Sequence, residues 1–265
     1  MKDSQEKPIL EIKDLGIQFG GLRAVSNFNM NLYPGELVGL IGPNGAGKTT
    51  VFNMLTGVYT PTDGDIFFQG ERINGLPPFK VTRKGISRTF QNIRLFNELS
   101  VLDNVKVANH SLAKHSVLSS IFRLPSHFAG EKEMEEKSLQ FLEIFDLHTL
   151  KDEKAKNLPY GMQRRLEIAR ALAAGPKVLL LDEPAAGMNP QETNDLMELI
   201  AFIRERFDLT ILLIEHDMRL VMGICERITV LDHGITIAEG TGEEIRTNPK
   251  VIEAYLGEEV SNINA

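Results

Sequence analysis

One short run of residues has the spacing of a loop that binds nucleoside triphosphates. It extends from Gly42 to Thr49 and fits the pattern G-x-x-x-x-G-K-[ST]. Glycines let such a backbone wrap closely around phosphate oxygens with its N–H groups pointing inwards. Lys48 can reach the β- and γ-phosphates, and the Thr49 hydroxyl is placed to bind Mg²⁺. The alternative is a glycine-rich turn that binds nothing, and the flanking segments decide between the two.

The segments on either side of this loop are those that a phosphate-binding loop requires. Leu37–Ile41 is a short apolar run typical of a buried strand, and Thr49–Thr56 has a helical pattern that Gly57 ends. The amino terminus of that helix would add the positive end of its dipole to the site. The sequence therefore predicts that the chain binds ATP or GTP. The predicted nucleotide contacts are Gly42, Pro43, Asn44, Gly45, Ala46, Gly47, Lys48, Thr49 and Thr50.

Two acidic residues follow a second apolar strand. Val178–Leu181 is wholly aliphatic and leads directly into Asp182 and Glu183. Such a strand is typical of the centre of a parallel sheet, and open α/β sheets bind their ligands at the carboxyl edge. Asp182 is predicted to hold Mg²⁺, and Glu183 to orient or deprotonate the attacking water. Together with the loop, the pair predicts a triphosphate hydrolase.

Composition excludes several classes of protein. The net charge is −7 and lysine and arginine form no block, which argues against nucleic acid as the main ligand. Cys225 is the only cysteine, so no internal disulfide forms and a reducing compartment is expected. Met1–Glu11 has no apolar segment typical of a signal peptide, and no apolar run approaches the ~20 residues of a membrane helix. These features predict a soluble cytoplasmic protein.

The order of the other segments predicts a mixed architecture. Further strands are expected at Ile9–Phe19, around Phe28–Leu32, and at Asp65–Gln69, Ile86–Gln91, Leu209–Ile214, Arg227–Leu231 and Ile235–Ala238. Helices are expected at Val101–His110, Glu131–Phe145, Met162–Ala173, Pro190–Arg206 and Pro249–Leu256. A small antiparallel sheet should thus flank the nucleotide strand, and a helix-rich stretch should interrupt the α/β order.

Two more polar residues fall at the ends of predicted strands and suggest a family. Gln91 ends the strand before the helical stretch, and His216 follows Leu209–Ile214. In this order of motifs the chain resembles the nucleotide-binding subunits of ABC (ATP-binding cassette) transporters over nearly its whole length. The resemblance implies that Gln91 lies near Mg²⁺ and the attacking water, and that His216 contacts the γ-phosphate. It also implies that Phe19 stacks on adenine, with Val25 as a second apolar contact.

The same resemblance implies a fold and its divisions. The fold class is α/β, with a P-loop NTPase (RecA-like) core containing a parallel sheet, a flanking antiparallel β-subdomain and an inserted α-helical subdomain. A single ABC ATPase domain would occupy residues 1–265. The core and β-subdomain would take about residues 1–91 and 175–257, and the helical subdomain about 92–174. A polar tail would occupy 258–265.

The family's signature motif is changed in this chain. Its usual form is Leu-Ser-Gly-Gly-Gln at the start of a helix that faces the partner subunit's ATP. Here the residues are Leu158, Pro159, Tyr160, Gly161 and Met162. Proline lacks the N–H and hydroxyl that serine would offer to phosphate, while the helix terminus stays available. Either the motif is a weakened half-site in an asymmetric dimer, or it is a subfamily variant that still works.

Several segments resemble the branched-chain amino acid importer subfamily: Gly85–Phe96, Pro184–Pro190, Ile214–Met218 and Ala254–Glu258. The resemblance implies an ATPase that powers an importer, with ATP and Mg²⁺ as cofactors. Expected partners are a second cassette (the same or a different chain), two integral membrane permeases and, indirectly, an extracytoplasmic solute-binding protein. The expected location is the cytoplasmic face of the inner membrane, as a peripheral protein.

Other interpretations stay open at this point. The cassette could serve a urea, amide or other amino-acid importer, belong to a non-transport ABC ATPase, or regulate without turnover. The apolar residues Val117, Leu118, Ile121 and Phe122 are expected either to face a permease or to pack within the helical insertion.

Overall fold

The computed structural model describes residues 7–110 and 125–255, and the chain separates into two compact units. The first unit combines the residues up to 81 with those from 177 onwards, and the second takes residues 82–176. Two sequence predictions fall outside the described residues: the apolar group at Val117, Leu118, Ile121 and Phe122, and the polar tail at 258–265.

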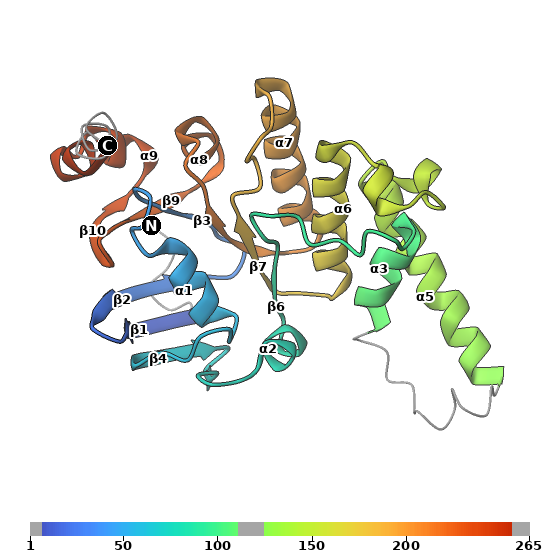
Figure 1. The fold of residues 1–265 in the computed structure, drawn as a ribbon, viewed down its shortest axis with the longest axis horizontal. Coiled ribbons are helices and arrows are strands. Elements are labelled where there is room, and N and C mark those ends of the chain that lie inside the picture. The colour runs from blue at the N-terminus through green and yellow to red at the C-terminus, as the bar shows by residue number, and fades with distance from the viewer. Residues whose placement is uncertain (1–6, 111–124, 256–265) are drawn as a thin grey trace. The chain divides into compact units, whose positions relative to one another are not determined.

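The elements are distributed along the chain as follows (Figure 1). The strands are β1 (Leu10–Phe19), β2 (Leu22–Leu32), β3 (Leu37–Ile41), β4 (Asp63–Phe68), β5 (Glu71–Arg72), β6 (Ile86–Arg88), β7 (Val178–Asp182), β8 (Thr210–Ile214), β9 (Arg227–Asp232) and β10 (Ile235–Gly240). The helices are α1 (Lys48–Leu55), α2 (Pro78–Lys84), α3 (Val101–His110), α5 (Pro125–Ile144), α6 (Tyr160–Ala173), α7 (Pro190–Arg206), α8 (Met218–Ile224) and α9 (Gly242–Thr247). Short 3₁₀ turns occupy His148–Leu150 and Ala155–Asn157, and residues 249–255 are helical.

A mixed sheet forms the centre of the first unit. Its strands there follow the order β10-β9-β3-β8-β7. β3 is parallel to both β8 and β9, β7 is parallel to β8, and β10 is antiparallel to β9. All residues of β3, β7 and β8 are buried, as expected for parallel strands covered on both faces. Because these three strands run the same way, the residues that follow them lie at one edge of the sheet.

A second, antiparallel sheet in the first unit has the order β2-β1-β4-β5. The period of two in β2 has the predicted effect: Phe28, Met30 and Leu32 are buried, whereas the asparagines between them are exposed. β1 pairs with β2 on one side and with β4 on the other. The sequence prediction of an α/β core with a parallel sheet and a flanking antiparallel sheet is confirmed.

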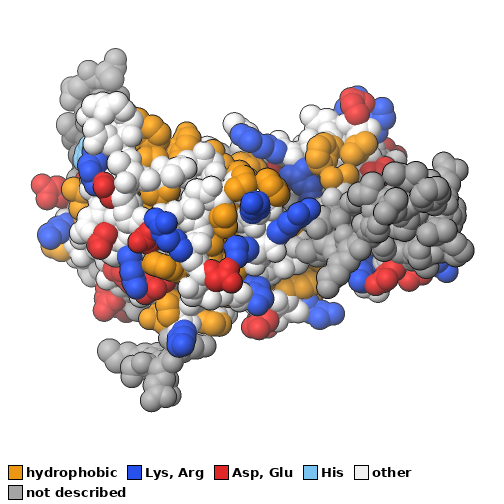
Figure 2. Space-filling view, turned by 90° about the horizontal axis from the view of Figure 1, so that it is seen from below, with side chains coloured by type: hydrophobic (Ala, Val, Ile, Leu, Met, Phe, Trp, Pro, Cys, Tyr) orange, Lys and Arg blue, Asp and Glu red, His pale blue; other side chains and the backbone are white. Residues whose placement is uncertain are grey.

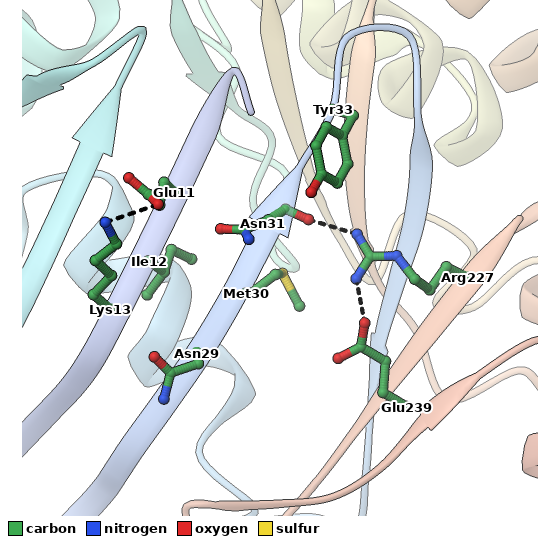
Figure 3. A pocket seen from close by; sticks show the side chains of 9 residues that line it. All are labelled: Glu11, Ile12, Lys13, Asn29, Met30, Asn31, Tyr33, Arg227 and Glu239. Atoms are coloured by element: carbon green, nitrogen blue, oxygen red, sulfur yellow. Dashed lines mark hydrogen bonds and ion pairs between the residues drawn. The ribbon is translucent and has the colours of Figure 1, made fainter. Parts of the chain in front are cut away.

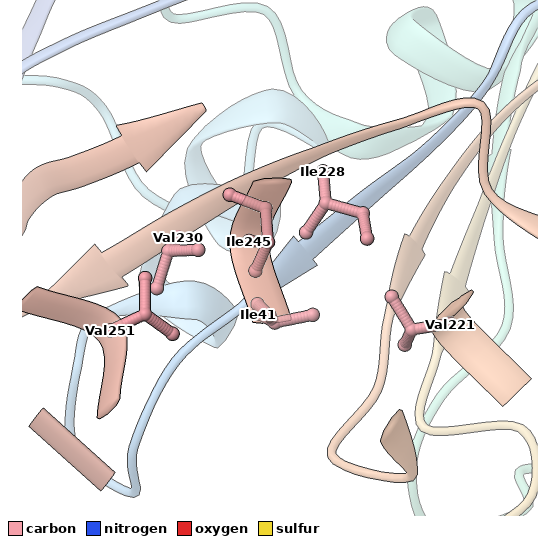
Figure 4. Close-up of a cluster of buried hydrophobic side chains, with 6 residues drawn as sticks. All are labelled: Ile41, Val221, Ile228, Val230, Ile245 and Val251. Carbon is pink, nitrogen blue, oxygen red and sulfur yellow. The ribbon is translucent and has the colours of Figure 1, made fainter. Parts of the chain in front are cut away.

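A compact apolar cluster lies against β3 and β9 (Figure 4). Ile41 from β3 and Ile228 and Val230 from β9 pack with side chains of α8, α9 and the helical residues 249–255. Ile41 is fully buried and immediately precedes Gly42, so this packing fixes the point where the predicted phosphate-binding loop begins. Its other members are Val221, Ile245 and Val251.

The second unit is helical apart from the short strand β6. α3, α5 and α6 pack against one another, and Ser100 caps α3 by accepting a hydrogen bond from the Asp103 N–H at 3.0 Å. Three predicted boundaries in this unit are wrong. The helix expected to begin at Glu131 begins at Pro125. The strand expected to reach Gln91 ends at Arg88, because the Phe90 carbonyl is bound by a side chain of α6. The helix expected from Met162 begins at Tyr160, directly after Pro159, whose ring fits a helix start.

Candidate nucleotide-binding site

The loop between β3 and α1 has the close backbone packing that its glycines permit. Gly42 and Gly47 have φ angles of 149° and 103°. A Cβ on Gly42 would collide with the carbonyl oxygen of Leu231, and one on Gly47 would lie 2.9 Å from that of Ala24. Only glycine fits both positions, so the loop curves tightly enough to surround a phosphate group.

Lys48 lies inside this curve. Its side chain is buried, and Nζ donates to the carbonyl oxygens of Gly42 at 2.6 Å and Pro43 at 2.8 Å. Asn44 and Gly45 at the tip of the loop are exposed, as is Thr49 in the first turn of α1, whereas Ala46 is buried and Thr50 is half-buried. The ammonium is therefore held within the loop, while Thr49 is exposed to solvent. This arrangement suits an incoming polyphosphate.

The predicted acidic pair lies at the same sheet edge. Asp182, the last residue of β7, is 3% exposed and aligns with Ile214, the last residue of β8. The next residue, Glu183, has a φ of 45°, and its N–H donates to the Ile214 carbonyl at 2.9 Å. A left-handed conformation costs a non-glycine residue about 1–3 kcal/mol, so the surrounding structure must impose it. Glu183 therefore departs from the extended backbone of β7.

This turn brings two predicted site residues together. The Nδ1 atom of His216, beyond the end of β8, lies 3.6 Å from Oε2 of Glu183. The Glu183 side chain is 15% exposed and that of His216 is 62% exposed. A shielded carboxylate thus faces a solvent-accessible imidazole. Such a pair could orient a water molecule and contact a transferred phosphoryl group.

The predicted adenine contacts lie on β1 and β2. Phe19 is 43% exposed and packs edge-to-face with Tyr59, with ring centroids 5.2 Å apart. The exposed part of the ring could accept a purine ring. Val25 is fully buried, and its Cγ2 lies 3.2 Å from where a Cβ on Gly47 would be. Val25 therefore packs beneath the loop.

The remaining predicted residues belong to the second unit. Gln91 is exposed, and its carbonyl accepts a hydrogen bond from Arg164 at 2.8 Å. In the signature segment Leu158 is buried, Gly161 is half-buried, and Pro159, Tyr160 and Met162 are exposed. Pro159 is the N-cap of α6 and makes no side-chain capping hydrogen bond. The first-turn N–H groups of this 14-residue helix thus lack a side-chain cap of that kind.

The donors at the sheet edge suit Mg²⁺. The Thr49 hydroxyl and the Asp182 carboxylate are hard oxygen ligands, and Mg²⁺ typically takes one or two of these together with water and phosphate oxygens. Within residues 7–110 and 125–255, no group of three or more histidine, cysteine, aspartate or glutamate side chains could hold a metal by itself. The residues present therefore fit a magnesium ion that arrives with a nucleotide.

Comparison with known proteins identifies the family. The profile of the ABC transporter family matches residues 25–186. The chain belongs to the ABC transporter family. Over 95% of its length it is 51% identical to the high-affinity branched-chain amino acid transport ATP-binding protein LivG of Escherichia coli (strain K12), of which 99% is covered. It is 50% identical, with the same coverage, to the corresponding protein BraF of Pseudomonas aeruginosa.

Two other similarities concern this cassette's carboxyl-terminal part and its fold. A profile described as branched-chain amino acid ATP-binding cassette transporter matches residues 236–261. A solved ATP-binding cassette of an ABC transporter, in its ADP conformation, superposes with a TM-score of 0.82 and 32% identity, covering 95% of this chain and 99% of that one. The chain is thus a nucleotide-binding, ATP-hydrolysing cassette of a family that works as dimers with membrane permeases.

Sequence reasoning missed one buried carboxylate of the cassette. Glu215, between β8 and His216, is 1% exposed. It accepts hydrogen bonds from the backbone N–H groups of Ala185 at 2.8 Å, His216 at 3.1 Å and Asp217 at 3.5 Å. Burial raises the pKa of Glu215, and these three hydrogen bonds act in the opposite direction. The residue joins the loop after Glu183 to the segment carrying His216. The only sequence signal was its place between two predicted site elements.

A polar groove of about 520 Å³ lies elsewhere in the cassette's first unit (Figure 3). Its charged side chains are paired with one another. Arg227 donates to Glu239 at 2.6 Å, to Glu36 at 3.1 Å and to the Asn31 carbonyl, and Lys13 pairs with Glu11 at 2.9 Å. These bonds join β2 to β9 and β10, so Arg227 has a structural role in holding the two sheets together.

The described surface of the cassette carries both signs of charge. On the face in Figure 2, lysine and arginine side chains lie among acidic and apolar ones. Among the helices of residues 7–110 and 125–255, none has the length and apolarity needed to cross a membrane.

Proposed function

We propose that this cassette hydrolyses ATP to power the import of branched-chain amino acids. The observation that carries the chemistry is the meeting of the Lys48 loop, Asp182, and the Glu183–His216 pair at one edge of a parallel sheet. The solute class is supported by the identity to LivG and BraF, whose names state branched-chain amino acid transport.

Phosphate binding is assigned to the loop and the start of α1. Residues Gly42–Thr50 surround the triphosphate, and Lys48 neutralises the β- and γ-phosphates. Thr49, Asp182 and Gln91 hold Mg²⁺, which when bound neutralises phosphate charge. Phe19 stacks on adenine, and Val25 supports the loop from below. Positioning and charge neutralisation supply most of the rate enhancement of phosphoryl transfer.

Hydrolysis is assigned to the pair at the ends of β7 and β8. Glu183 orients the attacking water and accepts its proton, while His216 contacts the γ-phosphate. The 3.6 Å separation of their side chains lets one water lie within reach of both. The family resemblance assigns Gln91 to the same water.

The other half of each ATP site is assigned to a partner cassette. The segment Leu158–Met162 faces the partner's ATP through the first-turn N–H groups of α6. Because these groups do not need the Pro159 side chain, we take the motif as a working variant. The cassette pair acts on two integral membrane permeases at the cytoplasmic face of the membrane, and a solute-binding protein delivers the amino acid from outside.

Reconstitution tests this function. The chain, its partner cassette and two permeases are placed in vesicles. Leucine uptake is measured with the solute-binding protein on the outer side and with ATP and Mg²⁺ in the compartment that faces the cassettes. Leucine transport that depends on ATP and competes with isoleucine and valine is expected. Transport of urea or another amide, with no leucine transport, would point to the alternative importer class. ATP hydrolysis that the permeases do not alter, with no transport of any of these solutes, would support a non-transport ATPase.

A further inference from the structure

A buried arginine joins the signature helix to the segment around Gln91. Arg164 of α6 is fully buried and is the largest such side chain among the described residues. Its Nη1 donates to the Phe90 carbonyl at 2.6 Å, and its Nη2 donates to the Gln91 carbonyl at 2.8 Å. A buried guanidinium is tolerated only when paired, and its planar fork fixes the direction of both partners. Two successive peptide groups are thereby attached to one helix.

A second side chain of α6 completes this attachment. Glu167 is 1% exposed, accepts a hydrogen bond from Arg164 Nη1 at 2.8 Å, and accepts another from the Arg94 N–H at 3.0 Å. The Arg164–Glu167 pair therefore holds residues 90–94 at both ends. The guanidinium of Arg94 also lies over the Phe90 ring, 4.3 Å from its centroid.

The same guanidinium reaches the exposed start of α6. Arg164 Nη2 donates to the hydroxyl of Tyr160 at 3.2 Å. Tyr160 is the first residue of the helix and is 45% exposed. A single buried cation therefore contacts both the backbone of Gln91 and the signature segment. Neither can shift without breaking charge-assisted hydrogen bonds in a buried environment.

We propose that Arg164 is a positioning residue that links the two ATP sites of the cassette dimer. The inference rests on the proposed function, in which Gln91 serves the chain's own ATP and Leu158–Met162 faces the partner's ATP. When the partner's ATP displaces the signature segment, Arg164 moves the Gln91 backbone with it. When the chain's own ATP displaces Gln91, Arg164 moves the signature segment. Each cassette thus senses both sites through one side chain.

The test uses the assembled transporter and a charge-balanced variant. Arg164→Met combined with Glu167→Met removes the link without leaving a buried unpaired charge. Arg165→Met is the matched control, because the neighbouring Arg165 pairs with the exposed Asp146 at 3.2 Å. Tyr160→Phe removes one hydroxyl and leaves both carbonyl bonds. Thermal melting and binding of a fluorescent ATP analogue to the single chain establish that each variant is folded with an intact loop.

The two ATP sites are tested separately by inactivating one of them and placing the double variant on either chain. With separately tagged cassettes, the Glu183→Gln change, or its equivalent in the other cassette, leaves one active site. In the first complex, called the shared-chain arrangement, one chain carries both the double variant and the disabled glutamate. The site that stays active then contains the signature segment of that chain. In the second complex, the double variant and the disabled glutamate lie on different chains. The site that stays active then contains the Gln91 of the chain with the double variant.

The expected result is at least a tenfold lower kcat in both arrangements, relative to complexes carrying only the disabled glutamate. Arg165→Met should stay within twofold, and Tyr160→Phe should lower kcat mainly in the shared-chain arrangement. A loss in only one arrangement, in neither, or only in proportion to the unfolded fraction would overturn the link. Failure of the proposed function itself would look different, because the unmodified complex would then hydrolyse ATP without transporting leucine, whatever the effect of the double variant on kcat.

Discussion

Glu183 and His216 come from different strands but lie 3.6 Å apart, from Oε2 to Nδ1. Their meeting depends on the parallel pairing of β7 with β8, which aligns Asp182 with Ile214. It also depends on the left-handed backbone at Glu183, where φ is 45°. The sheet sets the distance between the two chain segments, and the strained residue aims the carboxylate.

Replacing Glu183 by glutamine should separate ATP binding from hydrolysis. Glutamine keeps the size of the side chain but cannot accept a proton from water. Hydrolysis by the assembled complex should fall about 10²- to 10⁴-fold, the range of a lost general base. ATP affinity of the chain should change less than about threefold, because the loop residues remain. Phosphate release and equilibrium binding measure the two effects.

Glu205→Gln, on the exposed surface of α7, is the control for this change. It removes the same charge from the chain, but not at the carboxyl ends of β7 and β8. Turnover of Glu183→Gln close to that of Glu205→Gln would remove Glu183 as the base.

Replacing Gly47 by alanine should distort the loop. Its φ is 103°, and the new Cβ would lie 2.9 Å from the Ala24 carbonyl oxygen. We expect a loss of about 1–3 kcal/mol in unfolding free energy and loss of measurable ATP binding. Urea unfolding and nucleotide titration measure both. Gly21→Ala is the control, because a Cβ there meets no atom within 4 Å.

The sequence predicted the core sheets because their signals are local. The aliphatic runs of β3, β7 and β8 and the alternation in β2 each lie within one element. Helices α2, α8 and α9 were missed, since with seven, seven and six residues they span too few turns to show a period. Element existence could be read from pattern, but short helices depend on tertiary packing.

Two buried charged residues show what local patterns cannot reveal. Arg164 bonds to Phe90, 74 positions away, and Glu215 bonds to Ala185, 30 positions away. Neither pairing has a signal in its own segment, because burial and partners are set only when the chain is folded. The roles assigned to Lys48, Asp182 and Glu183 came from motif chemistry, and that of His216 came from the family resemblance. All four stay predictions, and Glu183→Gln tests one of them.

Replacing Phe19 by alanine should weaken base recognition without affecting phosphate binding. Stacking of a base on an aromatic ring contributes about 1–3 kcal/mol, or roughly 5- to 150-fold in Kd. ATP affinity should fall by that factor, while inorganic tripolyphosphate should bind unchanged. Leu22→Ala is the control, since this neighbouring side chain is 69% exposed. Equal losses for ATP and tripolyphosphate would mean that Phe19 supports the loop and does not contact adenine.

Glu215 should make the stability of the fold depend on pH in a defined direction. Burial raises its pKa above the ordinary value of 4.5, so the folded chain holds this proton when the unfolded chain has released it. The unfolding free energy contributed by this group is therefore full below pH 4.5 and decreases as pH rises through the raised value. Glu215→Gln removes the titration and keeps an oxygen for the Ala185 N–H.

Comparing the two proteins across pH removes the contribution of groups that do not interact with Glu215. The unfolding free energy of the wild type, minus that of Glu215→Gln, should fall in urea titrations as pH rises above 4.5. A difference that rises over this range would mean that the three backbone N–H bonds outweigh burial and hold the carboxylate charged.

The same variant should lower ATP hydrolysis while single-chain ATP affinity stays unchanged, because Glu215 joins the Ala185 loop to His216.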